Sequence, residues 1–356
     1  MIPLELDSPY LLVDADILDR NLTRTAAEAA AGSIALRPHA KTHKCLPVAR
    51  RQLELGAAGL TVATVGEAEI FADGGCADVF LAYPVWAAGG RGERLRRLAD
   101  RVALRIGIDS AEGASTLASA LRGAPAQVLV EIDSGHRRSG VDPAAAVGVA
   151  AAARDAGLTV AGVFTFPGHG YGPGQRGRAA ADEADALHRA DLALRAAGMP
   201  AEVRSGGSTP TAALADRRVL TEMRPGSYVF NDAQQVELGA CDWSDVALCA
   251  VATVVSRRDR QIILDTGSKV LGADRPGWTT GHGRLPDHPE ARLTALSEHH
   301  ATAVFPPEGP VPALGSRLRV VPNHVCTAVN LADELIVASG ETVLERWPVA
   351  ARGANS

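Results

Sequence analysis

The chain has 356 residues, of which 46% are hydrophobic and 22% charged, and its formal net charge at pH 7 is −5. This composition indicates a soluble globular protein with one large domain or two unequal ones. The acidic balance excludes a basic surface for a phosphate backbone, so we expect neither a nucleic acid nor a membrane as partner. The first residues lack the features of a signal peptide, and five cysteines without a C-x-x-C pair favour a reducing, cytoplasmic compartment.

Short β-branched runs alternate with Ala/Arg/Leu-rich stretches over roughly the first 230 residues. Helical periodicity is clear at residues 48–55, 93–99, 144–156 and 179–197. Runs that suit buried parallel strands cover residues 35–39, 59–63, 78–82, 102–108, 128–132, 160–166, 202–205 and 222–224. Eight strands with intervening helices predict a closed (β/α)8 barrel of the TIM type.

The pattern changes after about residue 242. Runs at residues 246–255, 261–264, 317–321 and 334–337 are separated by Gly/Pro/Asp turns, which is typical of antiparallel β structure. We therefore expect two domains: a barrel over residues 8–240, and a mostly-β domain over residues 241–350 together with residues 1–7. The segment before residue 35 is expected to pack against, or pair with, the β region.

In such barrels the active site lies at the carboxyl ends of the strands. Polar clusters follow six of the predicted strands: residues 38–44, Asp109, and residues 133–140, 167–171, 205–209 and 225–228. Residues 205–209 and 225–228 combine glycines, which let backbone N–H groups approach an anion, with hydroxyl donors. They predict a phosphate cradle on neighbouring loops, although simple Gly/Ser turns are the alternative.

Lys41 is the candidate Schiff-base residue, because a lysine at the inner end of a barrel strand is desolvated and its amine is then suited to attack a carbonyl. Arg138 is placed to face the far side of a ring bound at that lysine; a solvated surface residue is the alternative for both. His324 and Cys326, two apart on a segment expected to be extended, form a zinc-type ligand pair with open coordination positions. A buried core pair is the alternative. Residues 297–300 either face the substrate or lie behind the metal ligands, or equally form a helix end or a loop.

The motif Pro38-His39-Ala40-Lys41-Thr42-His43-Lys44 resembles the cofactor-lysine motif of the D-threonine aldolase / D-serine dehydratase family, whose barrel is of the alanine racemase type (fold-type III). Pro322-Asn323-His324-Val325-Cys326 resembles the metal motif in the β domain of the same family. Residues 131–141, 168–171, 205–211 and 224–232 are also similar to family segments, so the resemblance covers nearly the whole chain.

The resemblance implies pyridoxal 5'-phosphate (PLP) on Lys41, which would also be the α-proton base, with Arg138 facing the pyridine nitrogen. His169 and Tyr171 would border a small amino acid substrate. His324 and Cys326 would bind Zn²⁺, or Mn²⁺ or Mg²⁺ as in aldolase-like members. The residues implied for cofactor binding are Lys41, Arg138, Tyr171, Ser205, Gly207, Ser208, Thr209, Gly226, Ser227 and Tyr228.

Two reactions fit this arrangement. A dehydratase would convert D-serine or another 3-hydroxy-D-amino acid to a 2-oxo acid and ammonia. A D-threonine aldolase would break the Cα–Cβ bond to glycine and an aldehyde, with His43 or His169 as base. The dehydratase is favoured because family aldolases are expected to carry an aspartate at the position of Cys326, although His299-His300 departs from the expected Glu-His pattern.

Two further alternatives are more distant. A racemase needs a second base, often a tyrosine of the β domain, but the tyrosines at positions 10, 83, 171 and 228 all precede the β region. A non-catalytic PLP carrier would consist of the barrel alone, which the added β region disfavours. Because related barrels pair head to tail, we expect a homodimer.

Overall fold

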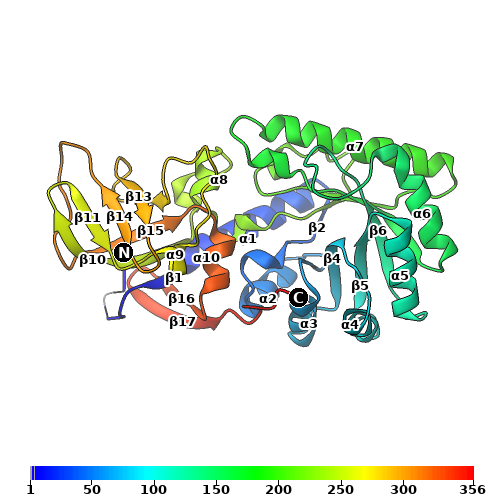
Figure 1. Cartoon of the computed structure of the whole chain (residues 1–356), viewed down its shortest axis with the longest axis horizontal. Coiled ribbons are helices and arrows are strands. Elements are labelled where there is room, and N and C mark those ends of the chain that lie inside the picture. Colours follow the sequence, from blue (N-terminus) through cyan, green and yellow to red (C-terminus); the bar gives the residue numbers. More distant parts are fainter. Residues whose placement is uncertain (1, 4) are drawn as a thin grey trace. The chain divides into compact units, whose positions relative to one another are not determined.

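The chain forms two compact units in the computed structural model, which describes residues 2–3 and 5–356 (Figure 1). The β unit comprises the N-terminal segment up to Thr23, Thr42–Cys45 and Ser227–Arg352. The barrel unit comprises Arg24–Lys41, Leu46–Gly226 and Gly353–Ser356. Of the residues expected in the barrel domain, residues 8–23, 42–45 and 227–240 group with the β unit. Within the expected segment 1–7, residues 1 and 4 lie outside the described residues.

The barrel unit contains a sheet of eight parallel strands, as predicted. The strands are β2 (Ala35–Leu36), β3 (Leu60–Val62), β4 (Asp78–Pro84), β5 (Ala103–Ile108), β6 (Gln127–Glu131), β7 (Thr159–Phe164), β8 (Val203–Gly206) and β9 (Glu222–Met223). Their order is β2-β9-β8-β7-β6-β5-β4-β3. A parallel bridge between His39 and Thr61 links the segment after β2 to β3. The sheet therefore closes on itself as the sequence predicted.

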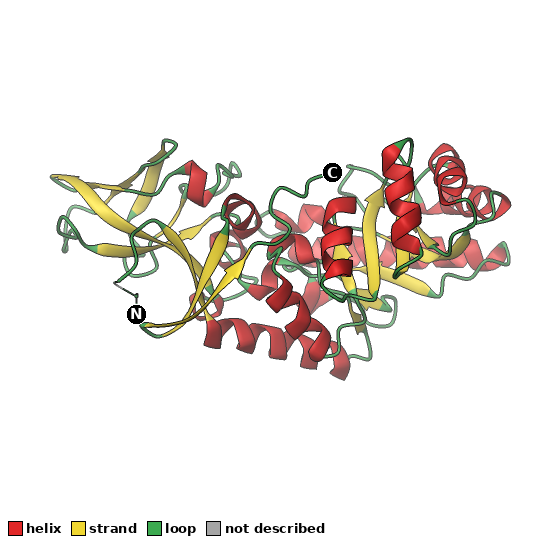
Figure 2. Ribbon diagram, turned by 90° about the horizontal axis from the view of Figure 1, so that it is seen from below, coloured by secondary structure: helices red, strands yellow, loops and turns green. Residues whose placement is uncertain are grey.

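Helices alternate with these strands along the chain. Figure 2 shows the helices in red and the strands in yellow. The helices are α2 (Leu46–Glu54), α3 (Val65–Asp73), α4 (Gly90–Ala99), α5 (Ala111–Leu121), α6 (Ala146–Asp155) and α7 (Arg176–Ala196). Side-chain hydroxyls cap the N-termini of α3 and α5. The Thr64 hydroxyl accepts the Glu67 N–H, and the Ser110 hydroxyl accepts the Gly113 N–H. The predicted helices at 48–55, 93–99, 144–156 and 179–197 are confirmed within a few residues at each end.

Charged side chains fill part of the barrel interior. Arg37, which is 1% exposed, donates from Nε to Glu222 at 2.7 Å and from Nη1 to Asp78 at 2.7 Å. Arg224 donates to the Ser205 hydroxyl at 2.5 Å and lies against the Phe80 and Phe164 rings. Because a buried charge that loses its partner is costly, this network fixes β2, β4, β8 and β9 relative to one another.

The β unit contains a nine-stranded sheet. Its strands are β1 (Tyr10–Asp14), β10 (Leu248–Arg258), β11 (Gln261–Leu264), β12 (Gly283–Arg284), β13 (Arg292–Leu296), β14 (Ala301–Val304), β15 (Arg317–Pro322), β16 (Glu334–Ser339) and β17 (Thr342–Pro348). All pairs are antiparallel except β1 with β16. β1 lies between β10 and β16, which confirms that the segment before residue 35 pairs with the β region.

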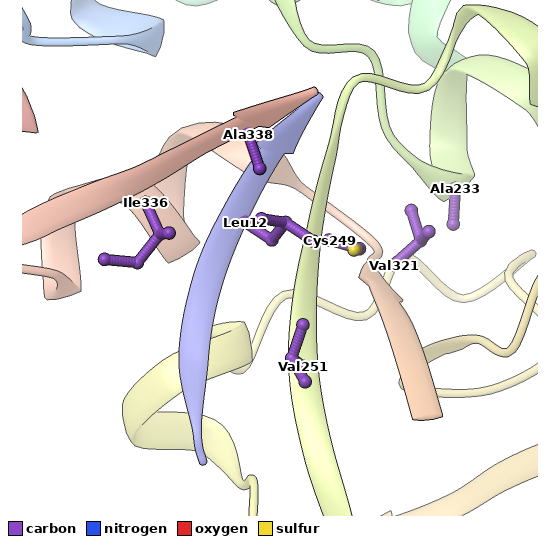
Figure 3. Packing of buried hydrophobic residues seen from close by; sticks show 7 residues of the cluster. All are labelled: Leu12, Ala233, Cys249, Val251, Val321, Ile336 and Ala338. Carbon is purple, nitrogen blue, oxygen red and sulfur yellow. The ribbon is translucent and has the colours of Figure 1, made fainter. Parts of the chain in front are cut away.

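Short helices accompany this sheet: α8 (Ala233–Glu237), α9 (Ser268–Leu271) and α10 (Val325–Leu331), while α1 (Ala15–Ala31) follows β1. A buried apolar cluster joins the elements, with Leu12 from β1, Cys249 and Val251 from β10, Val321 from β15 and Ala233 from α8 (Figure 3). It anchors the end of β15, just before His324, and the start of α8, just after Asp232. Within the described part of the chain, no helix has the length and apolarity to cross a membrane.

Candidate active site

Lys41 lies at the carboxyl end of the first barrel strand, as predicted. After β2 the chain continues to His39, whose N–H donates to Pro225 O at 3.0 Å, and a 3-10 turn over Ala40–Thr42 carries the lysine. The Lys41 N–H points back to His39 Nδ1 at 3.4 Å. The half-buried side chain is therefore presented at the strand-end rim where barrel enzymes place their chemistry.

A cavity of about 400 Å³ opens beside Lys41 within the barrel unit. Its lining residues lie in the last residues of β4 or after the ends of β2, β3, β5 and β6: His39, Lys41, Ala63, Ala82, Tyr83, Pro84, Asp109, Arg138 and Ser139. The volume falls in the range of small-molecule sites, about 300–1,000 Å³. Lys41 and Arg138, predicted separately from sequence, thus line one cavity.

Phe166, which follows β7, connects several of the candidate residues. Lys41 Nζ lies 5.6 Å from its ring centroid and Arg138 Cζ lies 5.1 Å from it. The Tyr171 and His136 rings lie 6.2 Å and 5.4 Å away. Sequence reasoning missed this residue; the available signal was its position at the end of the predicted strand 160–166, directly before the Pro167-Gly168-His169 cluster.

The Arg138 guanidinium is half exposed and lies 4.0 Å from Glu131 Oε1 at the end of β6. Burial raises the pKa of Glu131, against the lowering effects of a hydrogen bond with Ser139 and of the Arg138 charge. Its Oε2 is buried without a hydrogen-bond partner among the described residues. The turn that carries Arg138 is fixed by Asp133, whose Oδ1 accepts two backbone N–H groups, and by Asp109, which accepts the Gly140 N–H.

The two candidate bases have different surroundings. His169 lies in a 3-10 turn over Gly168–Tyr171, with Nε2 3.2 Å from Asp182 Oδ2. Its Nδ1 is buried without a partner among the described residues. His43 belongs to the β unit, is fully buried, and accepts the Cys45 N–H at its Nδ1 at 3.1 Å. His169 therefore has a carboxylate that orients its ring, whereas His43 is held by backbone.

The two predicted phosphate loops follow adjacent strands, since Ser205 pairs with Glu222 and Gly206 with Met223. Several expected donors already have protein partners. The Ser205 hydroxyl donates to Glu222 at 2.6 Å, and the Gly207 N–H, at φ +78°, donates to Glu183 at 2.6 Å.

Further along the first loop, the Ser208 N–H donates to Thr211 Oγ1 at 3.0 Å, and Thr209 is half-buried. On the second loop, Gly226 ends the barrel unit, while Ser227 and the buried Tyr228 begin a 3-10 turn of the β unit. Gly207 and Ser208 thus define the shape of the first loop through bonds to protein groups. An anion would have to use other donors of these two loops, or displace these partners.

His324 and Cys326 lie in contact in the β unit, but not as expected. The sequence suggested one extended segment; instead His324 is extended, at φ −131° and ψ 107°, and Cys326 lies in the first turn of α10. Helix geometry, rather than strand alternation, thus brings the thiol to the imidazole. Burial alone would lower the pKa of His324, but the charge and hydrogen bond of Cys326, with Asp232 and Asp274, raise this pKa to about 9.

Three neighbours surround this pair. Asp232, fully buried, lies 3.9 Å from His324 Nδ1 and accepts the Val325 N–H at 3.0 Å. The Thr42 hydroxyl lies 3.2 Å and the Ser227 hydroxyl 3.8 Å from the sulfur of Cys326. Asp232 was not identified from sequence. Across residues 2–3 and 5–356, no group of three or more His, Cys, Asp or Glu side chains could hold a metal ion; the pair would leave coordination positions open.

The loop alternative holds for residues 297–300, whereas two of the tyrosines group with a different unit than their sequence position suggested. Residues 297–300 form an exposed turn between β13 and β14, in which Glu298 pairs with Lys269 at 2.9 Å. Tyr10 and Tyr228 precede the β region in sequence but belong to the β unit. The hydroxyl of Tyr10 donates to Pro3 O at 2.6 Å.

Two family models match the chain. Residues 13–234 match "Alanine racemase, N-terminal domain", and residues 247–338 match "Putative serine dehydratase domain". The chain is 36% identical to a D-threo-3-hydroxyaspartate dehydratase of Delftia sp. HT23, over 91% of this chain and 92% of that protein. It is 33% identical to a D-threonine aldolase of Arthrobacter sp., over 98% and 93%.

Solved structures agree with these matches. A D-threonine aldolase from Filomicrobium marinum superposes with a TM-score of 0.91 at 34% identity, covering 99% of this chain and 98% of that one. An alanine racemase from Bacillus anthracis, at 14% identity and a TM-score of 0.71, shares the fold. The chain therefore belongs to the D-threonine aldolase / D-serine dehydratase family of PLP-dependent lyases, built on a barrel of the alanine racemase type.

Proposed function

We propose that this lyase dehydrates a β-hydroxy D-amino acid, D-serine or another 3-hydroxy-D-amino acid, to a 2-oxo acid and ammonia, using PLP and a divalent metal. The observation that carries the proposal is the sulfur of Cys326 in contact with His324 in the β unit. A soft thiolate beside an imidazole selects Zn²⁺ over Mn²⁺ or Mg²⁺. An ion held there, as a Lewis acid, suits removal of a β-hydroxyl group.

The barrel rim fits the cofactor on three observations. Lys41 lines a cavity of about 400 Å³, and Arg138 supplies a permanently charged donor on its wall. Gly206 leaves no space for a Cβ beside Glu183, so backbone rather than side chains forms the start of the phosphate loop. Bound PLP would supply an electron sink for negative charge at the substrate Cα.

Each candidate residue then has a proposed role. Lys41 holds the cofactor and moves the α-proton, Arg138 faces the ring nitrogen, and Tyr171 and His169 border the substrate. Ser208, Thr209, Gly226, Ser227 and Tyr228 remain the proposed contacts of the phosphate, together with Gly207 and Ser205, whose own donors already bond to Glu183 and Glu222.

The metal ligands are positioned by protein groups. The carboxylate of Asp232 lies beside His324 Nδ1, which would leave Nε2 for the ion, as carboxylate–histidine pairs do in metal sites. The hydroxyl of Thr42 lies 3.2 Å from the sulfur of Cys326, and Thr42 is bonded to Lys41. One similar solved structure is a variant of a D-threo-3-hydroxyaspartate dehydratase "in the metal-free form".

D-threonine aldolase activity is the second candidate. The observation that favours it is His169, whose ring is oriented by Asp182 and whose buried Nδ1 has no partner among the described residues. Such an imidazole can take the proton of a β-hydroxyl group, as a retro-aldol cleavage requires. The alternative of a non-catalytic PLP carrier lacks support. Such a carrier would consist of the barrel alone, whereas residues 247–338 of this chain match a dehydratase domain. Racemisation is supported by the match of the barrel to an alanine racemase domain and by a fold shared at 14% identity, whereas the relatives that cover the whole chain are lyases.

Product analysis tests the proposal. The protein is incubated with PLP and Zn²⁺ or Mn²⁺, and D-serine, D-threonine and D-threo-3-hydroxyaspartate are offered separately. We expect a 2-oxo acid and ammonia in equal amounts; glycine and an aldehyde as the only products would refute the dehydratase and establish the aldolase. Cys326→Asp should lower the dehydratase rate, whereas Cys241→Ser, the matched thiol control, should not.

Three simpler tests accompany this experiment. Lys41→Ala should abolish the visible absorption of the lysine-bound cofactor, and retention of that absorption would mean that another lysine carries it. We also propose a homodimer, which a monomeric mass by light scattering at full activity would contradict. A cytoplasmic location is proposed from the five free cysteines, which fractionation of expressing cells checks.

A further inference from the structure

A buried carboxyl group lies directly behind the first predicted phosphate loop. Glu183, on α7, is 0% exposed, and its Oε1 accepts the Gly207 N–H at 2.6 Å. Gly207 has φ +78°, a conformation that glycine adopts without strain. A Cβ at Gly206 would overlap the same oxygen atom. The loop therefore takes its conformation at residues 206 and 207 from contact with one carboxyl group.

The remainder of the loop is fixed by a different residue. Thr211 Oγ1 accepts the Ser208 N–H at 3.0 Å, and the Thr211 N–H donates back to Ser208 O at 3.1 Å. This closes residues 208–211 as a local turn that makes no use of Glu183. Loss of Glu183 would thus release the first half of the loop and leave the second half in place.

The charges around Glu183 are few. Arg224, on the chain directly after β9, is the charged group that acts on this carboxyl from the elements packed against it; the Gly207 amide is the other polar influence. Arg224 itself donates to Ser205 Oγ and to Thr165 O. The second oxygen, Glu183 Oε2, is buried without a hydrogen-bond partner among the described residues. Burial raises the pKa of Glu183 to about 7, against the Gly207 amide and Arg224.

We propose that Glu183 is a positioning residue for the phosphate end of the cofactor, which holds the Gly207 amide and so sets the loop, while its own negative charge opposes the phosphate. This inference rests on the proposed PLP site. Two separable effects follow. The acceptor atom of Glu183 should strengthen phosphate binding through the loop, and the ionised state should weaken it, so that the phosphate group binds with uptake of a proton.

A pair of ligands isolates the phosphate group. PLP and pyridoxal share the ring and the aldehyde carbon, but the free 5'-hydroxyl of pyridoxal closes on the aldehyde as a hemiacetal. Because this closure is a property of the ligand and not of the protein, the change in the ratio of the two dissociation constants between wild type and variant, at one pH, reports the phosphate contribution. The ratio is measured by absorbance titration between pH 6.5 and 8.5. The variants are Glu183→Gln, which keeps an acceptor for Gly207 but cannot ionise, and Glu183→Ala, which removes both.

The expected results have opposite signs. For the wild type, the preference for PLP over pyridoxal should fall by about tenfold as pH rises. A tenfold change corresponds to a rise of one unit in the pKa of Glu183 when the phosphate group binds. Glu183→Gln should lose that dependence and prefer PLP more strongly than the wild type at pH 8.5. Glu183→Ala should weaken PLP by about tenfold or more, because the Gly207 amide loses its partner, and leave pyridoxal unchanged.

Glu67 provides a matched control, because it is also buried and its Oε2 accepts the Ala63 N–H, at 2.7 Å, on another rim loop. Glu67→Gln should change the dissociation constants of PLP and pyridoxal by the same factor. The inference would be overturned if the Glu183 variants changed the dissociation constants of both ligands equally. It would also be overturned if Glu183→Gln kept the pH dependence of the wild type. If Glu183→Ala does not fold, Glu183→Gln decides. Wild-type protein without any preference for PLP would instead refute the proposed phosphate site, and the inference with it.

Discussion

We predict that the buried carboxyl group of Glu183 lowers the stability of the barrel in a pH-dependent way. Burial raises the pKa of Glu183 from its ordinary value of 4.5 to about 7 in the folded state. Below pH 4.5 the group is protonated in both states and contributes no difference. As pH rises towards 7, the unfolded chain loses this proton first, so the folded state becomes less favoured. Above pH 7 the full difference applies, about 3 kcal/mol.

Glu183→Gln measures this cost. Glutamine has the same size and keeps an acceptor for the Gly207 N–H, but it never ionises. The free energies of unfolding of wild type and variant, from urea denaturation of the apo-protein, should therefore diverge by about 2–3 kcal/mol between pH 5 and pH 8, in favour of the variant. Glu54→Gln, on the exposed side of α2, controls for the loss of one negative charge from the chain. If the free energies of unfolding of wild type and Glu183→Gln differ by the same amount at pH 5 and at pH 8, the argument from burial is refuted.

Three further changes have defined outcomes. Asp232→Asn should weaken Zn²⁺ binding by about 10–100-fold, because the carboxylate beside His324 is lost; competition with a chelating dye measures this, and unchanged affinity would contradict the orienting role. Glu222→Gln should lower the free energy of unfolding by about 3 kcal/mol, since Arg37 loses a buried charged partner; a change in thermal midpoint no larger than that of a surface variant would count against it. Leu12→Ala should cost about 2–5 kcal/mol in the cluster of Figure 3, measured by denaturation, and a neutral effect would show that the β unit tolerates the cavity.

Much of the barrel could be predicted from sequence because its signals are local. Most buried strands are short apolar runs, and six of the eight predicted strands are followed by a polar cluster that the fold places on one rim. Lys41 and Arg138 were located by that rule alone, and they line one cavity. The strands at β2 and β9 are shorter than predicted, because the ladder ends at Leu36 and at Met223, before the predicted ends at residues 39 and 224.

The groups that position these residues could not be predicted in the same way. Asp232 lies 92 residues from His324 in sequence, and Glu183 lies 24 residues from Gly207, so no spacing rule connects them. Phe166 had no polar signal at all. The H-x-C segment was assigned strand periodicity, although α10 begins directly after His324 and brings the thiol round by a helical turn. Such contacts depend on which elements meet, and a single sequence does not contain that information.

The path of the chain has a consequence for folding during synthesis. β1 is made early, but its partners in the sheet are β10 and β16, whose paired residues lie more than 200 positions later. Residues 24–226 carry all eight barrel strands and can pair before those partners exist. An apolar strand, Tyr10–Asp14, must therefore wait unpaired while the barrel forms. We expect the nascent chain to depend on protection of that strand, and the last step of folding to be its capture between β10 and β16.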